Sequence, residues 1–91
     1  MRMADRIRSK LQAKFNPERL DIIDESARHR GHAGAKPGGE THFRVTIVSA
    51  AFQGKSRLER QRAIYAALAQ ELADGVHALS LKAQVPNETN S

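Results

Sequence analysis

The 91-residue sequence contains no cysteine and no tryptophan, and it has one tyrosine. Without cysteine the chain can form no disulfide and can offer no thiolate as a nucleophile or metal ligand. The few aromatic side chains provide no obvious platform on which nucleic-acid bases could stack. No apolar run approaches the roughly 18 residues that a membrane-spanning helix needs, and no secretory signal is visible. We therefore expect a cytoplasmic protein that does not enter a membrane.

Positive charge is in excess, since 15 Lys and Arg residues against 10 Asp and Glu residues give a formal net charge of +5. A basic small domain can bind nucleic acid, an acidic protein or an anionic membrane surface. Ordinary charge for solubility is the competing explanation, and on charge alone it is the stronger one. With 40 % hydrophobic residues, a chain of this length predicts one small domain with a single core.

The segment 56–75 has the strongest pattern in the chain, and we predict that it forms a helix. Ser56 and Glu59 make a capping box, in which each side chain satisfies the other residue's backbone N–H. Gly75 suits the left-handed residue that ends a helix. An apolar stripe at helical spacing needs a sheet or a second helix to cover it. The predicted stripe is Leu58, Tyr65, Leu68, Ala69 and Leu72, and the polar residues off its centre are Arg57, Glu59, Arg60, Gln70 and Glu71.

The start of the chain has an amphipathic pattern that predicts another helix, at about residues 4–15, ended by Asn16-Pro17. Its apolar residues recur every four positions, at Met3, Ile7, Leu11 and Phe15. The other side carries a basic stack at the same spacing, made of Arg2, Arg6, Lys10 and Lys14. Basic side chains at a helix N-terminus oppose the helix dipole, so helix stability does not explain the stack. We interpret the stack as a candidate contact surface for a polyanion.

Three segments have the pattern of β-strands: 20–24, 41–49 and 76–83. The middle segment alternates most clearly, because its apolar residues share one face of a strand: Phe43, Val45 and Ile47. The glycine-rich stretch 25–40 separates the first two strands and carries His29 and His32. A loop of this length in a compact domain is usually functional or disordered.

These elements predict an α+β fold in a single small domain, residues 1–85, followed by a loose polar tail at 86–91. The predicted order is helix, strand, strand, helix, an optional further helix, and strand. The first two strands should pair antiparallel, while a right-handed helical crossover makes the second and third parallel. The expected result is a three-stranded mixed sheet with helices on one face.

Two nucleotide-binding patterns are incomplete in the chain. Gly54-Lys55-Ser56 stands between a strand and a helix, but a phosphate-binding loop also needs a glycine where Ser49 stands. We interpret Lys55 and Ser56 as a turn and an N-cap. The helix–strand order is similar to that of the KH module, which clamps a nucleic-acid backbone with a GXXG loop. The equivalent turn has only Gly54, so simple KH-type binding is not expected.

The histidines carry the clearest chemistry, although the spacing of each one taken alone is a weak signal. His77 opens the third strand just after the long helix, and the loop with His29 and His32 opens beside the same sheet. Two imidazoles could meet a metal ion there. Zinc would need four ligands, or three with water. In an iron–sulfur cluster two histidines can replace two thiolates on one iron, and this chain would need the thiolates of another molecule.

The order and spacing of several short motifs resemble the BolA family over nearly the whole chain, from about residue 7 to residue 86. The matching text is Asp24-Glu25-Ser26, Glu40-Thr41-His42-Phe43-Arg44-Val45, Ile47-Val48-Ser49, Phe52-x-Gly54-Lys55, Leu58-x-Arg60-x-Arg62 with Tyr65, Leu68-Ala69, Glu71-Leu72 and Val76-His77-Ala78-Leu79. The sequence departs from the family pattern at Gln61, where a histidine is frequent, and at Val85, where a threonine is usual.

The resemblance implies a class II KH-like fold without GXXG and a non-enzymatic partner of monothiol glutaredoxins. In such pairs a [2Fe–2S] cluster is shared, and the glutaredoxin contributes its cysteine and a glutathione thiolate. The BolA-like chain contributes the histidine that matches His77 and a Cys or His from the loop. His32 fits the second position when counted back from Thr41-His42-Phe43, and His29 fits when counted forward from Glu25-Ser26. We favour His32 and interpret His42 as a structural or surface residue.

The resemblance also implies an alternative function, because some relatives are DNA-binding regulators of envelope, motility and stress genes. The candidate DNA surface here is Lys55, Arg57, Arg60, Arg62 and Lys82. Scattered basic residues on a helix are more often an ordinary solvated face. We expect the free chain to be a monomer, with a homodimer as the alternative.

Overall fold

The computed structural model describes residues 2–25 and 41–86. The elements follow the predicted order. They are α1 (Met3–Phe15), β1 (Arg19–Asp24), β2 (His42–Val48), the short 3-10 helix η2 (Ala50–Phe52), α2 (Arg57–Ala67), α3 (Ala69–Asp74) and β3 (Ala78–Gln84). The part of the glycine-rich stretch that contains His29 and His32, and the tail from residue 87, lie outside the described residues.

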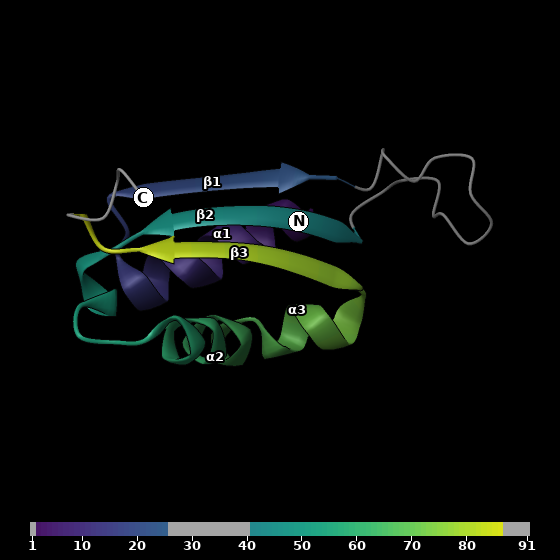
Figure 1. Cartoon of the computed structure of the whole chain (residues 1–91). Coiled ribbons are helices and arrows are strands. Elements are labelled where there is room, and N and C mark those ends of the chain that lie inside the picture. Colours follow the sequence, from purple (N-terminus) through teal and green to yellow (C-terminus); the bar gives the residue numbers. More distant parts are fainter. Residues whose placement is uncertain (1, 26–40, 87–91) are drawn as a thin grey trace.

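The three strands form one sheet in the order β1-β2-β3, which confirms the predicted mixed topology. β1 pairs with β2 antiparallel, with Ile22 opposite Val45. β3 runs parallel to β2, with Leu81 beside Val45. Figure 1 shows the three α-helices on one face of this sheet, and no helix of the described residues covers the other face. The fold is therefore a two-layer α+β domain.

The core lies between the sheet and the helices. Alternate residues of β2 point into it, as the strand pattern predicts, and α1 adds one residue from each of three successive turns. The buried apolar residues that form the core cluster are Ile7, Leu11, Phe15, Phe43, Val45, Ile47, Phe52, Ile64, Leu68, Val76 and Val85.

α1 ends at the residue that the sequence predicted, Phe15. Asn16 adopts a left-handed conformation with φ 45°, and its N–H donates to the carbonyl of Gln12. The hydroxyl of the buried Ser49 donates to the carbonyl of Phe15 over 2.5 Å. The rings of Phe15 and Phe52 pack with centroids 5.0 Å apart. The helix end, the end of β2 and η2 therefore form one well-connected corner of the domain.

The segment 56–75 differs from the prediction in two ways. The capping box of Ser56 and Glu59 is present, but the helix breaks at Leu68, which has φ −105° and ψ 17°. The predicted stripe is right at Leu68, which is buried, and at Leu72, which packs against the core. It is wrong at Leu58 and Tyr65, which are 54 % and 39 % exposed, and it omits Ile64, which is fully buried. Ile64 lies about 100° around the helix from Tyr65, so the buried face is rotated from the expected one.

The buried face of α2 carries small side chains. Ala63 and Ala67 pack against the core beside Ile64 and Leu68, which lets the helix approach the sheet closely. Gly75 ends α3 with φ 146°, as expected for a position that favours glycine. Among the described residues, no helix is long and apolar enough to cross a membrane.

Candidate metal centre and basic edge

His77 is an exposed side chain on a firmly held backbone. Just before it, Val76 is buried, and its N–H donates to the carbonyl of Glu71 over 3.2 Å. The N–H of His77 itself donates to the carbonyl of Thr41 over 2.8 Å. The strand was predicted to include residue 77, but β3 begins at Ala78, so the histidine lies in the connection that leads into the strand. This arrangement presents the imidazole to solvent from a fixed position.

A second imidazole lies beside it. His42 is the first residue of β2, and its ring centroid is 6.4 Å from that of His77, with an angle of 30° between the ring planes. The Nδ1 atom of His42 is 3.0 Å from the hydroxyl oxygen of Thr41. The strand register explains the proximity, because His42 pairs with Ala78, the residue after His77. Spacing along the sequence did not reveal this pair, although the parallel pairing of the second and third strands could have suggested it.

The stretch 26–40, which carries His29 and His32, starts and ends beside His42. The N–H of Glu25, just before residues 26–40, donates to the carbonyl of His42 over 2.7 Å. Thr41, just after them, accepts the hydrogen bond from His77. The carboxylate of Glu25 also pairs with Arg44 over 3.2 Å. Both ends of the stretch that carries His29 and His32 are thus held at the start of β2, and the Thr41 end bonds to His77, although the structure does not describe those two histidines.

The donor set limits what this end of the molecule could hold. The described residues contain no group of three His, Cys, Asp or Glu side chains that could bind a metal ion. Two neutral imidazoles can serve as two ligands of one iron, but cluster chemistry also needs thiolates, and the sequence has no cysteine. The residues therefore fit one side of a shared centre and lack the donors for a complete one.

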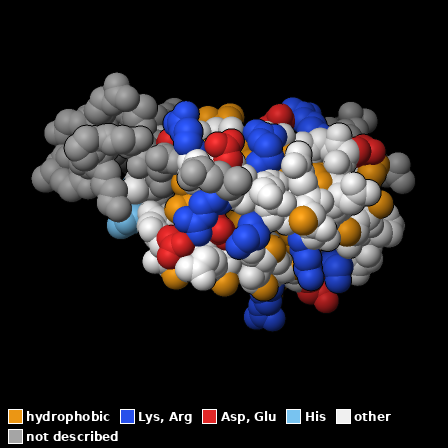
Figure 2. Space-filling model, turned by 180° about the vertical axis from the view of Figure 1, so that it is seen from behind, with side chains coloured by type: hydrophobic (Ala, Val, Ile, Leu, Met, Phe, Trp, Pro, Cys, Tyr) orange, Lys and Arg blue, Asp and Glu red, His pale blue; other side chains and the backbone are white. Residues whose placement is uncertain are grey.

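Half of the basic stack of α1 pairs with carboxylates of α3, so a structural role accounts for two of the four residues interpreted as a polyanion surface. Arg6 pairs with Asp74 over 2.6 Å and with Glu71 over 3.1 Å, and Lys10 pairs with Glu71 over 3.1 Å. Glu71 was predicted to lie off the centre of the apolar stripe, yet its side chain is only 1 % exposed. Figure 2 shows basic and acidic side chains next to one another on the face seen from behind. Two of the four stacked cations therefore join α1 to α3.

Hydrogen bonds to carboxylates shift two pKa values in the helices. The hydrogen bond from Arg6 lowers the pKa of Asp74 below its usual value, and the side-chain bond from Gln70 lowers it further. At the start of α2, the backbone N–H of Ser56 and then its hydroxyl lower the pKa of Glu59. Both carboxylates are therefore ionised at neutral pH.

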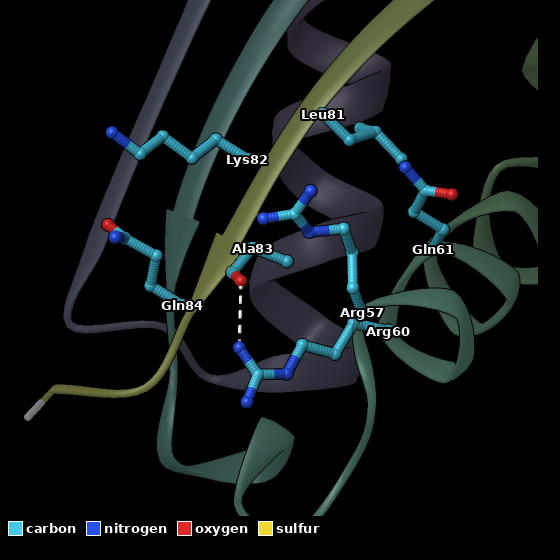
Figure 3. A pocket seen from close by; sticks show the side chains of 7 residues that line it. All are labelled: Arg57, Arg60, Gln61, Leu81, Lys82, Ala83 and Gln84. Atoms are coloured by element: carbon cyan, nitrogen blue, oxygen red, sulfur yellow. Dashed lines mark hydrogen bonds between the residues drawn. The ribbon is translucent and has the colours of Figure 1, made fainter. Parts of the chain in front are cut away.

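The five residues predicted to contact DNA divide into two sets. Arg57, Arg60 and Lys82 line a groove between α2 and β3, together with Gln61, Leu81, Ala83 and Gln84. Lys55 and Arg62 are exposed but do not line it. Figure 3 shows Arg60 donating to the carbonyl of Ala83, a bond of 3.0 Å, and Arg60 also donates to the carbonyl of Lys55. Arg60 therefore helps to hold α2 against β3.

Comparisons with known proteins agree with this fold. A family model described as BolA-like protein matches residues 11–88. "BolA-like protein 1" of Bos taurus is 51 % identical over 80 residues, which cover 88 % of this chain and 56 % of the bovine protein. The "DNA-binding transcriptional regulator BolA" of Escherichia coli strain K12 is 47 % identical over 81 residues, which cover 89 % of this chain and 73 % of that protein. The solved structure of BolA1 from Arabidopsis thaliana superposes with a TM-score of 0.83 at 46 % identity, with 93 % of each chain covered.

Proposed function

Since this chain belongs to the BolA-like protein family, we propose that it is a non-enzymatic adaptor that shares a [2Fe–2S] cluster with a monothiol glutaredoxin. The observation that supports the proposal is the position of His77, an exposed imidazole on a fixed backbone that bonds to Thr41, the residue just after the histidine-bearing stretch. The chain spans about half the length of the bovine relative, so the activity of the whole protein is part of the proposal.

The proposed division of ligands follows from the donors available. His77 and one histidine of the stretch 26–40, for which His32 is favoured over His29, would bind one iron as neutral imidazoles. The glutaredoxin would supply its cysteine and a glutathione thiolate, since this chain has no cysteine. When bound, the cluster supplies redox and iron-delivery chemistry, and this chain supplies nitrogen ligands. Imidazole ligands raise the reduction potential of an iron–sulfur centre relative to four thiolates.

The test is anaerobic co-purification of the chain with a monothiol glutaredoxin, followed by visible absorption and circular dichroism of the mixed complex. We expect His77→Ala to change both spectra, because one iron loses its ligand. His42→Ala is the matched comparison, since it removes the neighbouring imidazole: it should leave the spectra unchanged if the second ligand comes from the stretch 26–40, and changed spectra would point to His42 as that ligand. His32→Ala and His29→Ala, compared in the same way, identify the second ligand. Unchanged spectra with His77→Ala would contradict the ligand assignment.

DNA binding is the second candidate function, and the name of the Escherichia coli relative favours it. The candidate residues are Lys55, Arg57, Arg60, Arg62 and Lys82. Contacts with phosphates release counterions, so the affinity for duplex DNA should fall steeply as salt is raised. An affinity that does not change with salt would argue against this candidate. The cytoplasmic location, the monomeric free chain and the domain limit at residue 85 stay predictions.

A further inference from the structure

β3 is an edge strand, because β2 is its only neighbour in the three-stranded sheet of the described residues. The N–H of Ala78 donates to the carbonyl of Thr41, and the carbonyl of Gln84 accepts from the N–H of Ser49. The even-numbered residues of β3 therefore bond to β2. In a parallel ladder the residues between them direct their backbone groups the other way. The N–H and C=O groups of residues 79, 81 and 83 accordingly face the outer edge of the sheet.

Two side chains of α2 reach this edge without covering all of it. The hydroxyl of Tyr65 donates to the carbonyl of Leu79 over 3.4 Å, and the guanidinium of Arg60 donates to the carbonyl of Ala83 over 3.0 Å. Leu81 lies between these two positions, in the lining of the groove. A carbonyl oxygen has two lone pairs, so each occupied carbonyl can still accept a second hydrogen bond. The backbone of β3 can therefore still pair with another strand.

Positive charge lies on both sides of this edge. The groove along it encloses about 660 Å³, and no acidic side chain is among its lining residues. Figure 3 shows Arg57 on the α2 side of β3, whereas Lys82 extends from the strand in the opposite direction, over the face of the sheet without helices. Neither Arg57 nor Lys82 takes part in an ion pair within the described part of the chain.

We infer that the outer edge of β3 binds an extended acidic peptide segment of a partner protein by strand addition. An added strand points successive side chains to opposite faces. Carboxylates on one face would then meet Arg57, and those on the other face would meet Lys82. Main-chain hydrogen bonds to residues 79, 81 and 83 would give affinity, and the two cations would select acidic sequences.

Other occupants fit these observations less well. A second copy of the chain, paired edge to edge through β3, would bring the same cations together. A small anion would need converging charges, but Arg57 and Lys82 point to opposite sides of the strand. Single-stranded nucleic acid usually stacks its bases on aromatic side chains, and no aromatic residue lines the groove.

The proposed peptide site on the edge of β3 is separate from the proposed cluster site at His77 and does not depend on it. His77 precedes β3, and the groove lies along its second half. At about 3.3 Å per residue, residue 83 is roughly 20 Å from residue 77, and residue 79 is roughly 7 Å from it. The two sites use different residues and different contacts, so the two proposals can fail separately.

The probe is a synthetic ten-residue peptide of glutamate and valine, with glutamates on both faces of the extended chain. We expect it to shift the backbone amide NMR signals of residues 79–83 in the full chain. The double variant Arg57→Gln/Lys82→Gln should bind about tenfold more weakly, because it loses two exposed ion pairs. The matched double variant Lys55→Gln/Arg62→Gln loses the same charge outside the groove and should bind within about twofold of the original. Equal weakening in both variants would show general charge attraction and overturn the proposal.

Two further probes, an N-methylated peptide and duplex DNA, test the strand addition itself. The same peptide with N-methyl groups on alternate amides keeps its charge but loses the donors along one edge, so it should not shift residues 79–83. If the methylated peptide binds equally well, strand addition is wrong. If the glutamate peptide does not bind at all, Arg57 and Lys82 only protect the edge against aggregation. If duplex DNA shifts these signals and the peptide does not, the edge is a nucleic-acid surface.

Discussion

Two pairs of basic residues look alike in the sequence and differ in the structure. Arg6 and Lys10 of α1 contact the carboxylates of α3, and these contacts hold two helices together. Arg57 and Lys82 flank the edge of β3 and form no ion pair within the described residues. The same type of side chain is structural in one place and available for binding in the other. What separates the two pairs is the presence of an acidic partner from a distant part of the chain.

The largest expected effect comes from removing the cations of the first pair. The double variant Arg6→Met/Lys10→Met leaves the buried Glu71 carboxylate without a cation, which for a buried charge costs roughly 3 kcal/mol or more. We expect the melting temperature to fall by about 10 °C or more. Thermal unfolding followed by circular dichroism measures this.

Two controls sharpen the comparison. Arg2→Met/Lys14→Met removes the other half of the same basic stack and should change the free energy of unfolding by less than about 0.5 kcal/mol. Adding Glu71→Leu to Arg6→Met/Lys10→Met removes the buried carboxylate that has lost its cations, and it should recover much of the lost stability. If the triple variant is no more stable than the double, the cost does not come from the buried carboxylate.

Arg60 lies between the two cases, because it lines the groove and also donates to two backbone carbonyls. Arg60→Met removes those hydrogen bonds while keeping most of the apolar stem. We expect a loss of about 1 kcal/mol in the free energy of unfolding, measured in urea. Arg57→Met is the matched control, and it should have almost no effect on stability. Equal effects of the two substitutions would mean that Arg60 does not hold α2 to β3.

The smallest expected effect is a dependence on pH at Asp74. Its pKa is lowered in the folded protein, so its pairing with Arg6 stabilises the fold fully above the ordinary carboxyl value of about 3.9. That contribution is lost as the pH falls through the lowered folded-state value. Asp74→Asn should therefore lower the melting temperature by a few degrees at pH 7, and the difference should disappear in stronger acid. If the melting temperatures of the original chain and Asp74→Asn differ by the same amount down to pH 2, the ionised Asp74 carboxylate is not the source of the stability.

Local patterns were sufficient to predict most of the fold. The four-residue repeat of α1 predicted its buried residues, and the alternation of β2 predicted which of its side chains enter the core. The crossover from β2 to β3 through a helical segment predicted their parallel pairing. Each of these predictions depended on residues close to one another in the sequence, or on a general rule of chain connection.

Apart from the rotated face of α2, what the sequence did not predict depends on contacts between distant residues. Glu71 has the pattern of a solvated residue, but the cations of α1, more than 60 residues away, make its burial possible. The closeness of His42 and His77 follows from strand register, which spacing along the chain does not give. The role of His77 as a ligand and the choice between His29 and His32 stay predictions, since the structure does not describe the stretch 26–40.

The pairing of Arg6 and Lys10 with Glu71 has a practical consequence for shortened versions of the protein. The family match begins at residue 11, so a chain trimmed to that match would start after both cations. It would keep the sequence that identifies the family and lose the charges that Glu71 requires. Because Glu71 also accepts the backbone hydrogen bond that precedes His77, trimming the first ten residues should loosen the histidine at the opposite end of the sequence.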